Sequence, residues 1–467
     1  MYCKKHIFSL LLTFFVLSFV LVSCKSDDEA NEYSDQCYIS SFSLGSLKRT
    51  IYGHTTAGMD SIYTTTFSGT YFPMIIDQRK QTIENLDSLP IRTQLEKVLV
   101  SVDFEHMLVW RKADITNLED TTWHTYDSSD SIDLSEPLHF RVYSENATSS
   151  RTYTVKVNVH QQVGDSTNWD ALGNVEALMP TTERKVTVWN DKITILATQA
   201  DKTLLCIQHP LSTSGEWTSQ NTTGTAKAIP GTLQQQGNRL LISTTDGRLL
   251  ESTDAVTWTQ TGHPALTDMR LVAASKDYVY ALSAGKLYSS NGTSWNEEPL
   301  DDNANLLPSE QLNSIFYTLK SGMPRILLVG HQTGNNHYAA IWAKSWEEGQ
   351  ESQEKWIYYT PNEADKYRCP MLQNLCVVPY DDGFQALGGR SMDGTYEAMD
   401  SIRHSSDHGI SWKTYDNDDM NVDKAIQNAA KTAQYITATV DEKNFLWIVI
   451  DNQVWRGRIN RLGFLRK

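Results

Sequence analysis

The sequence predicts an all-β protein in which an N-terminal immunoglobulin-like β-sandwich is followed by a β-propeller. Two observations predict this class. Short runs of alternating apolar and polar residues recur along the chain, separated by turns rich in Ser, Asn, Asp and Gly. In addition, a segment that ends in Ser or Thr followed by Trp recurs from about residue 180 onward, and such internal repeats are typical of propellers.

The first 23 residues have the layout of a bacterial lipoprotein signal peptide. Lys4 and Lys5 precede an apolar run over residues 7–22, which is shorter than the ~20 residues needed to span a membrane. The run ends in Leu-Val-Ser-Cys24, and this sequence resembles the bacterial lipobox, in which the cysteine is acylated after cleavage. We therefore expect residues 1–23 to be removed and Cys24 to carry the lipid.

Residues 24–36 are expected to form a flexible, acidic tether. The segment that follows Cys24, Lys-Ser-Asp-Asp-Glu29, resembles the export signal of Bacteroidetes lipoproteins that are displayed on the cell surface. This predicts a lipid-anchored protein of the outer membrane. The formal net charge of −15 disfavours nucleic acid and anionic head groups as partners, so we expect the lipid alone to attach the chain to the membrane.

Residues 37–160 are predicted to form the sandwich. Its clearest strand contains Tyr153, Val155, Val157 and Val159, which alternate with polar residues as expected for a strand with one buried face. The Asn- and Ser-rich residues 144–150 indicate a hairpin turn before it. Further strands are expected at residues 38–44, 62–67, 71–76 and 98–104. The position of this domain after the tether suggests a spacer.

Residues 176–467 are predicted to form the propeller, with residues 161–175 as a linker or a ring-closing strand. The fullest repeat contains Ser405, Asp407, Gly409 and Trp412 and matches the Asp-box pattern Ser-x-Asp-x-Gly-x-Ser/Thr-Trp. Two copies that are one residue shorter contain Ser252, Asp254 and Trp258 in one case and Ser289, Asn291 and Trp295 in the other. Because the Asp can accept backbone hydrogen bonds and the Trp can pack between blades, we interpret these residues as structural.

The repeats favour six blades. Six apolar strands recur, and five of them are followed by a tryptophan, at positions 217, 258, 295, 356 and 412. Seven blades remain the alternative if residues 165–190 contain another. The last blade could be completed by its own C-terminal segment around Phe464, or by Asn168-Trp169 from the start of the unit, which would close the ring.

These features together resemble a known family. The lipobox, the sandwich, the Asp-box propeller and the ending Trp455-Arg-Gly-Arg-Ile-Asn-Arg-Leu-Gly-Phe464 resemble an uncharacterised Bacteroidetes surface lipoprotein family, a domain of unknown function of the DUF6242 type. Gly388-Gly389 after an apolar strand is also similar to a kelch blade. The resemblance implies a fold and a location, but it implies no chemistry.

The sequence favours a non-catalytic protein over an enzyme. The alternative is a sialidase-like glycoside hydrolase, because sialidases are propellers with Asp boxes. Their chemistry needs clustered arginines and carboxylates, whereas the arginines here are dispersed along the sequence. His404 and His408 flank a turn and do not form a convincing metal site, and the cysteines have no zinc-site spacing and favour buried free thiols. We therefore predict no catalytic residues, no metal and no cofactor.

The surplus of aromatic residues fits binding better than catalysis. Trp342, Trp346, Tyr358 and Tyr396 lie near the longer insertions and are candidates for stacking on a sugar. The expected partner is thus a glycan or an envelope protein. Because the chain is acidic and its arginines are dispersed, a neutral glycan or a protein is expected to bind in preference to an anionic one. The acidic insertion at residues 347–355 is expected to be a surface segment with little core.

Overall fold

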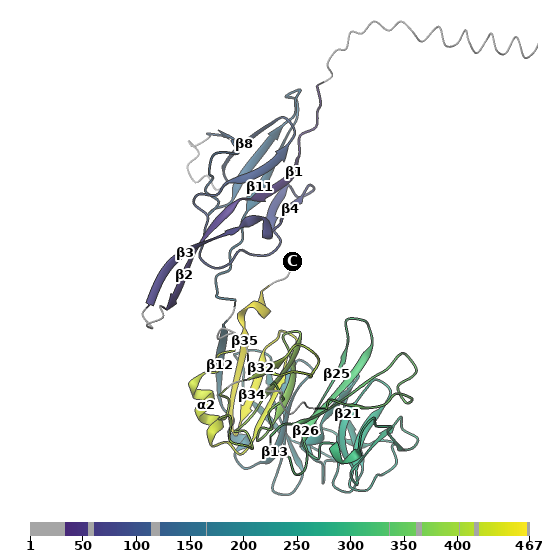
Figure 1. Cartoon of the computed structure of the whole chain (residues 1–467). Helices are drawn as coiled ribbons and strands as arrows, with labels where there is room; N and C mark the ends of the chain where they lie inside the picture. Colours follow the sequence, from purple (N-terminus) through teal and green to yellow (C-terminus); the bar gives the residue numbers. More distant parts are fainter. Residues whose placement is uncertain are drawn as a thin grey trace, which may run out of the picture. The chain divides into compact units, whose positions relative to one another are not determined.

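The computed structural model describes residues 33–54, 60–113, 122–164, 166–335, 337–360, 367–400, 402–414 and 420–464 (Figure 1). The signal peptide, Cys24 and most of the tether lie outside the described residues. The chain divides into two compact units, residues 1–162 with 466–467 and residues 163–465. Strands dominate both units, and the one α-helix in the described part of the chain is α2 (Lys424–Lys431). This confirms the all-β class.

Unit 1 consists of eleven strands in three sheets within the residues described. One sheet has the order β4 (Met74–Asp77), β5 (Thr82–Asn85), β11 (Ser150–Lys156), β10 (Leu138–Tyr143), β8 (Met107–Lys112) and β9 (His124–Thr125). A second has the order β3 (Asp60–Ser68), β2 (Ser46–His54) and β6 (Thr93–Gln94), and the third pairs β1 (Ile39–Leu44) with β7 (Val100–Phe104). The sheets enclose a single apolar core.

The strand expected at the end of unit 1 is present. Tyr153 and Val155 are buried on one face of β11, as the alternation predicts, and Tyr143 pairs with Ser150 across the predicted hairpin. The regular strand ends at Lys156, earlier than expected, and Val159 forms only an isolated parallel bridge to Leu89. The alternating pattern therefore located the strand but not its end.

Unit 2 contains six four-stranded antiparallel sheets within the described residues. The first sheet in chain order consists of β13 (Thr182–Trp189), β14 (Lys192–Thr198), β15 (Leu204–Pro210) and β16 (Thr218–Asn221). The second consists of β17 (Gln234–Gln236), β18 (Arg239–Ser243), β19 (Leu249–Ser252) and β20 (Thr259–Gln260). The third consists of β21 (Arg270–Ala274), β22 (Val279–Ser283), β23 (Lys286–Ser290) and β24 (Asn296–Glu297). The fourth consists of β25 (Glu310–Thr318), β26 (Pro324–His331), β27 (Ala340–Ser345) and β28 (Ile357–Tyr358). The fifth consists of β29 (Cys376–Tyr380), β30 (Gly383–Leu387), β31 (Arg403–Ser405) and β32 (Lys413–Thr414). The last has the order β12 (Thr167–Asn174), β35 (Gln453–Ile459), β34 (Leu446–Ile450) and β33 (Ile436–Val440).

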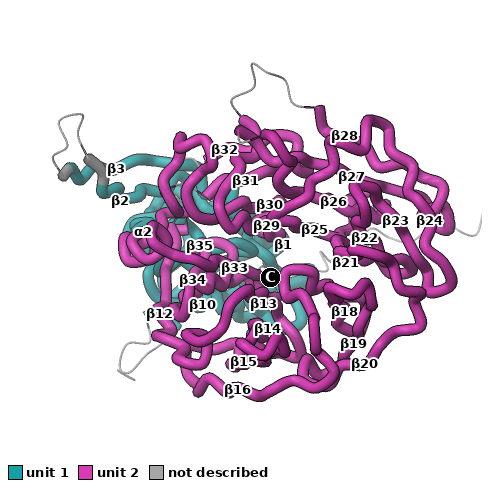
Figure 2. The backbone as a smooth tube through the Cα atoms, turned by 90° about the horizontal axis from the view of Figure 1, so that it is seen from below, with its two compact units in different colours: residues 1–162, 466–467 teal, residues 163–465 magenta. Residues whose placement is uncertain are grey.

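The first strands of these sheets surround a common axis. Strand β13 contacts β33, which contacts β29, and the series continues through β25 and β21 to β17. The 3-10 turn before β17, residues 230–232, contacts β13 and completes the circle. Figure 2 shows the arrangement, with the fourth strands at the periphery. Apolar side chains fill the space between neighbouring sheets, as in a propeller.

The ring is closed by joining the two ends of unit 2. Strand β12 pairs with β35, so that Asp170 lies opposite Arg456, and their side chains form an ion pair of 2.9 Å. Trp169 packs against Gly457, where an added Cβ would lie 2.3 Å from the indole ring. Of the two closures considered from the sequence, the one through residues 168–169 is thus confirmed. Residues 167–174 are a strand of the propeller and not a linker.

The Asp-box turns connect the third strand of a sheet to the fourth. In the fullest copy, Ser405 Oγ donates to Asp407, Asp407 accepts from the backbone N–H of Ser411, and Trp412 Nε1 donates to the Gly409 carbonyl at 3.0 Å. The copy at Ser252, Asp254 and Trp258 repeats this arrangement, with Trp258 Nε1 bonded to the Ala255 carbonyl. In the third copy, at Ser289 and Asn291, Trp295 instead bonds to the Pro264 carbonyl and is less buried. The three tryptophans precede β20, β24 and β32, in three different sheets.

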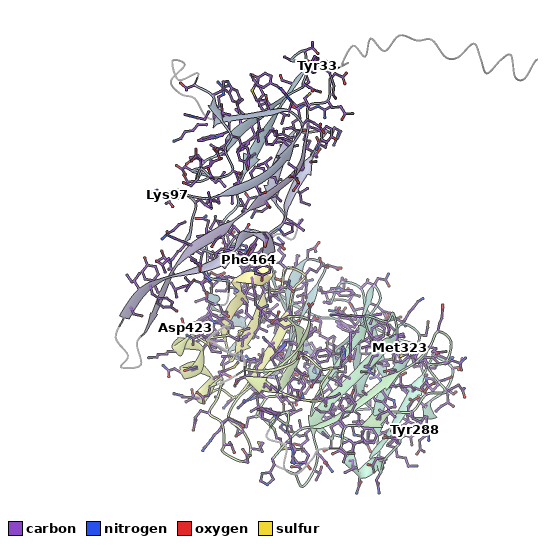
Figure 3. All side chains as sticks on the ribbon, turned by 45° about the horizontal axis from the view of Figure 1, so that its top comes forward. Tyr33, Lys97, Tyr288, Met323, Asp423 and Phe464 are labelled. Atoms are coloured by element: carbon purple, nitrogen blue, oxygen red, sulfur yellow. The ribbon has the colours of Figure 1, made fainter. Side chains whose placement is uncertain are left out.

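Figure 3 shows the side chains of both units, with Asp423 at the start of α2. The Asp423 carboxylate caps this helix by accepting from the backbone N–H of Ala425. None of the described helices is long and apolar enough to cross a membrane.

Candidate binding site at the mouth of the central channel

A cavity of about 290 Å³ opens where the first strands of the six sheets begin. Because these strands repeat the same direction around the axis, their starts meet at one mouth of the central channel. The residues that line this cavity are Glu183, Arg184, Lys185, Ile229, Gly231, Thr232, Arg270, Gln311, Leu312, Asn313, Asn374, Leu375, Cys376, Tyr435, Ile436 and Thr437. We call this cavity the channel mouth.

Lys185 is partly buried in the channel mouth. It lines this cavity together with Cys376, which belongs to a sheet beyond the neighbouring one. Desolvation by the surrounding strands lowers the pKa of the Lys185 ammonium group below its usual value. The side chain of Lys185 forms no hydrogen bond or ion pair with any residue that the structure describes.

Arg270, at the start of β21, is the second cation of the channel mouth. Its side chain is exposed and forms no ion pair within the described parts of the chain. Arg270 also borders a neighbouring cavity of about 290 Å³, which is lined by the loop of residues 304–309. The two cavities therefore meet at this guanidinium group.

Arg184 forms a fixed wall of the channel mouth. Its guanidinium group donates to the carbonyls of Leu178, Thr181 and Asp451. The same group lies over the ring of Tyr435, 4.6 Å from the ring centroid. Since these hydrogen-bond acceptors are backbone carbonyls, the arginine is held in place without a bound carboxylate.

Amide side chains tie the first strands together around the channel. Asn313 is buried, donates to the Leu375 carbonyl at 2.9 Å and accepts from the backbone N–H of Val377, which links β25 to β29. Deeper in the channel, Ser314 Oγ donates to Gln234 Oε1 at 3.0 Å. These bonds hold the walls of the channel mouth rigidly, as a preformed binding site requires.

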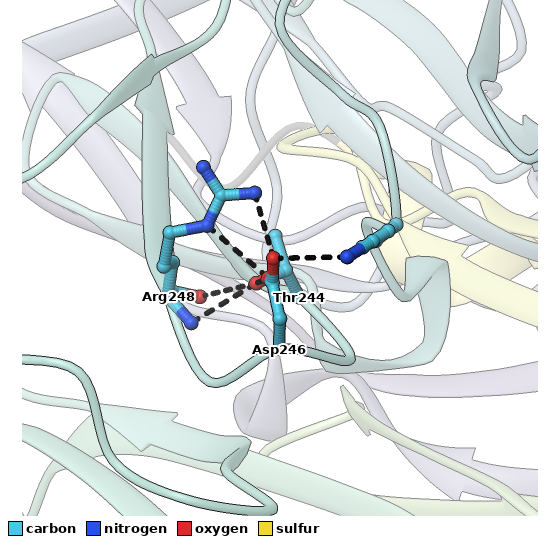
Figure 4. A network of polar contacts seen from close by, with 4 residues as sticks. Thr244, Asp246 and Arg248 are labelled. Atoms are coloured by element: carbon cyan, nitrogen blue, oxygen red, sulfur yellow. Dashed lines mark hydrogen bonds and ion pairs between the residues drawn. The ribbon is translucent and has the colours of Figure 1, made fainter.

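Some other basic groups of unit 2 are neutralised by carboxylates, as in one network (Figure 4). Asp246 accepts hydrogen bonds from Thr244 and from Arg248, and it forms an ion pair with Lys227 at 3.4 Å. The guanidinium group of Arg248 holds the pKa of the Asp246 carboxyl well below its usual range. Lys185 and Arg270 have no such carboxylate partner among the residues that the structure describes.

Two of the arginines that are dispersed along the sequence meet at the channel mouth. Arg184 and Arg270 are 86 positions apart in the sequence, but both belong to the first strands of sheets and meet Lys185 at one mouth. The cavity is lined by a single carboxylate, that of Glu183, as far as the described residues extend. A glycoside hydrolase needs a pair of carboxyl groups.

Three of the four predicted sugar-stacking residues are core residues. Trp342 is fully buried in β27, and Trp346 and Tyr358 are only 6% and 8% exposed. All three belong to the apolar core between two sheets. Trp342 and Tyr358 lie inside this core, and Trp346 also borders a cavity away from the channel mouth. The fourth, Tyr396, is partly exposed, but the guanidinium group of Arg403 covers its ring at 4.4 Å.

The insertion at residues 347–355 is a surface segment, as expected, in which Glu351 alone is buried. Glu351 is 5% exposed, and one of its carboxylate oxygens accepts a 2.7 Å hydrogen bond from the hydroxyl group of Tyr280. This segment borders another cavity, of about 520 Å³, with Phe316, Trp346 and Lys276. That cavity lies beyond the other ends of β21 and β25, away from the channel mouth.

The described residues contain no group of three or more His, Cys, Asp or Glu side chains that could hold a metal ion. His408 stacks on Tyr317 at 5.7 Å, and burial lowers the pKa of His404. The cysteines at positions 37, 206, 369 and 376 are buried free thiols.

Two family models match the sequence. Residues 163–467 match the DUF6242 beta propeller domain, and residues 42–157 match the N-terminal domain of DUF6242, a domain of unknown function. No curated protein matches the chain.

Several solved structures resemble the chain at low sequence identity. YCF48 bound to D1 peptide is 13% identical with a TM-score of 0.36, covering 62% of this chain and 96% of that one. The SapL1 lectin in complex with alpha methyl fucoside is 10% identical with a TM-score of 0.36, covering 58% of this chain and 90% of that one. The extracellular domain of BT4673 from B. thetaiotaomicron is 12% identical with a TM-score of 0.32, covering 68% of this chain and 36% of that one. At these identities the likeness concerns the fold alone.

Proposed function

The chain belongs to the DUF6242 family, and from this we propose that it is a non-catalytic lipoprotein of the cell surface whose propeller binds a glycan or a protein partner. The observation that carries the proposal is the channel mouth. Side chains from distant parts of the sequence meet there in a cavity with rigid walls. Two of its cations, Lys185 and Arg270, form no ion pair within the described part of the chain. Such convergence of polar groups in a concave site is typical of ligand binding.

We propose that the six four-stranded sheets are six propeller blades, and that unit 1 is an immunoglobulin-like spacer. In this arrangement the lipid on Cys24, the acidic tether and unit 1 would present the propeller to the medium. The formal net charge of −15 supports attachment through the lipid, because an acidic surface is not attracted to anionic head groups.

The location can be tested with Cys24→Ala. This variant should remain unacylated and should be lost from the outer membrane, as measured by mass spectrometry and by surface labelling of intact cells. Ser26→Ala, two residues further on, is the matched control and should leave both properties unchanged. Native protein without an acyl chain at residue 24 would contradict the proposed anchor.

The alternative is a propeller-type glycoside hydrolase related to sialidases. The single carboxylate at the channel mouth supports binding over hydrolysis, since hydrolysis requires a general acid together with a nucleophile or base. A glycan array probed with the whole chain, with hydrolysis measured on the same glycans, separates the two functions. Binding without turnover is the expected result, and sialidase turnover that Glu183→Gln abolishes would establish the hydrolase instead.

A further inference from the structure

The channel mouth differs in charge from the rest of the protein. Its lining contains the cations Arg184, Lys185 and Arg270 but only the carboxylate of Glu183 among the residues described, whereas the whole chain has a formal net charge of −15. A local excess of positive charge in an acidic protein attracts anions to that place alone.

The environment of Lys185 makes this excess unfavourable in the unliganded protein. Its ammonium group is partly removed from water by the surrounding strands, and no carboxylate in the described structure compensates it. An uncompensated charge in such a position costs free energy, and perturbed charges of this kind are concentrated at functional sites. An anionic group of a ligand would supply the missing partner.

The size and the other groups of the channel mouth limit the rest of the ligand. A volume of about 290 Å³ is at the lower end of the roughly 300–1,000 Å³ found for small-molecule sites. Neutral polar side chains, those of Gln311, Asn374 and Tyr435, line the remaining wall and can bond to hydroxyl groups. This combination fits a single hydroxyl-rich ring with one acidic group.

We infer that the channel mouth binds a sugar residue that carries a carboxylate, with Lys185 and Arg270 on the carboxylate and the amide and hydroxyl side chains on the ring. This inference rests on the proposed function and gives its ligand a chemical class. The cavity beside Arg270 offers space for the next residue of a glycan chain. The inference of an acidic ligand replaces the expectation of a neutral one, which assumed that the basic side chains are dispersed over the protein.

The test measures binding of monosaccharides to the mature chain by calorimetry or ligand-observed NMR. The probes are D-galacturonate, D-glucuronate and N-acetylneuraminate, with D-galactose and D-glucose as their uncharged counterparts. At least one acidic sugar should bind about tenfold or more tightly than the neutral ones, and its binding should weaken as salt increases. A carboxylate occurs both in uronic acids and in sialic acids, and comparison of the two kinds of probe shows which of them binds.

Three variants locate the binding. Lys185→Met and Arg270→Met should each weaken binding of the acidic sugar by about tenfold or more, because each removes a charge-assisted hydrogen bond. Lys276→Met is the matched control, since this exposed lysine borders the cavity at the other ends of the strands. It should bind as the wild type does. Thermal unfolding measures whether each of the three variants is folded. If Lys185→Met does not fold, Arg270→Met alone carries the test.

Several results would overturn the inference. They are equal binding of acidic and neutral sugars, acidic binding that survives both channel-mouth substitutions, and binding of a glutamate-rich peptide without any acidic sugar. A neutral glycan or a protein found to bind at the channel mouth would also overturn it, but would leave the proposed binding function standing. No ligand of any class on the array would instead count against the proposed function itself.

Discussion

Replacing Lys344 by methionine should destabilise unit 2 strongly, because the lysine neutralises a buried acid. Lys344 on β27 and Glu298 are 0% and 3% exposed and form a buried ion pair. Glu298 also accepts a 2.9 Å hydrogen bond from Trp356 Nε1. Lys344→Met leaves the carboxylate buried with the indole N–H as its partner, and breaking a buried pair in this way costs about 3–5 kcal/mol.

The neighbouring sheet offers a control for this prediction. Lys286 and Glu297 also form an ion pair, of 2.8 Å, but their side chains are 51% and 53% exposed. Lys286→Met should therefore change the free energy of unfolding by no more than about 1 kcal/mol. The double variant Lys344→Met/Glu298→Gln should recover much of the loss, since it leaves no unpaired charge and keeps an acceptor for the indole.

Urea unfolding followed by tryptophan fluorescence measures these differences. Most of the 13 tryptophans belong to unit 2, so the signal reports mainly on the propeller. Similar unfolding free energies for Lys344→Met and Lys286→Met would refute the reasoning. So would a double variant that is less stable than the single one, because it would show that packing and not charge dominates at this position.

Three further predictions concern other parts of the chain. Gly457→Ala should destabilise unit 2 by about 1–3 kcal/mol, because its Cβ would lie 2.3 Å from the ring of Trp169; an unchanged urea midpoint would contradict this close approach. Burial raises the pKa of the Glu351 carboxyl, so its contribution to stability is fully present below the unfolded pKa of about 4.3 and is lost as pH rises through the higher folded pKa. Glu351→Gln should remove that loss in urea unfolding between pH 4 and 8, and an identical pH profile would contradict it. Burial raises the pKa of Cys206 to about 12, so iodoacetamide at pH 8 should modify this thiol only after denaturation, as mass spectrometry would detect.

Local patterns in the sequence predicted the strands and the repeats well. Alternation located β11, and the Asp-box spacing placed Trp258, Trp295 and Trp412 before the fourth strands of three sheets. These features depend on neighbouring residues: a turn of fixed length needs its own hydrogen-bond acceptor and its own tryptophan. Where the third copy lacks the aspartate, its tryptophan makes a different hydrogen bond, to the Pro264 carbonyl.

The burial of the aromatic residues could not be predicted in the same way. Trp342 and Tyr358 lie near a long insertion in the sequence, which suggested exposed loops. In the structure they lie on adjacent strands of one sheet and face the next sheet. Glu351 of the insertion likewise accepts a hydrogen bond from the hydroxyl group of Tyr280, which belongs to a different sheet. Contacts between sheets depend on how neighbouring blades pack, and no local pattern encodes that.

The channel mouth illustrates the same limit from the functional side. Each first strand contributes one to three lining residues at or just before its start. The residues that line the cavity are therefore spread along the sequence from residue 183 to residue 437. Seen along the sequence, the basic residues among them look like ordinary surface charges in an acidic chain. Only closure of the ring, through the pairing of β12 with β35, brings all of the first strands around one axis and so places Lys185 opposite Cys376. A variant that strains this pairing, such as Gly457→Ala, should therefore weaken ligand binding at the channel mouth even though residue 457 does not line it. A variant of the Asp-box tryptophan Trp295, which is only partly buried, should affect binding less.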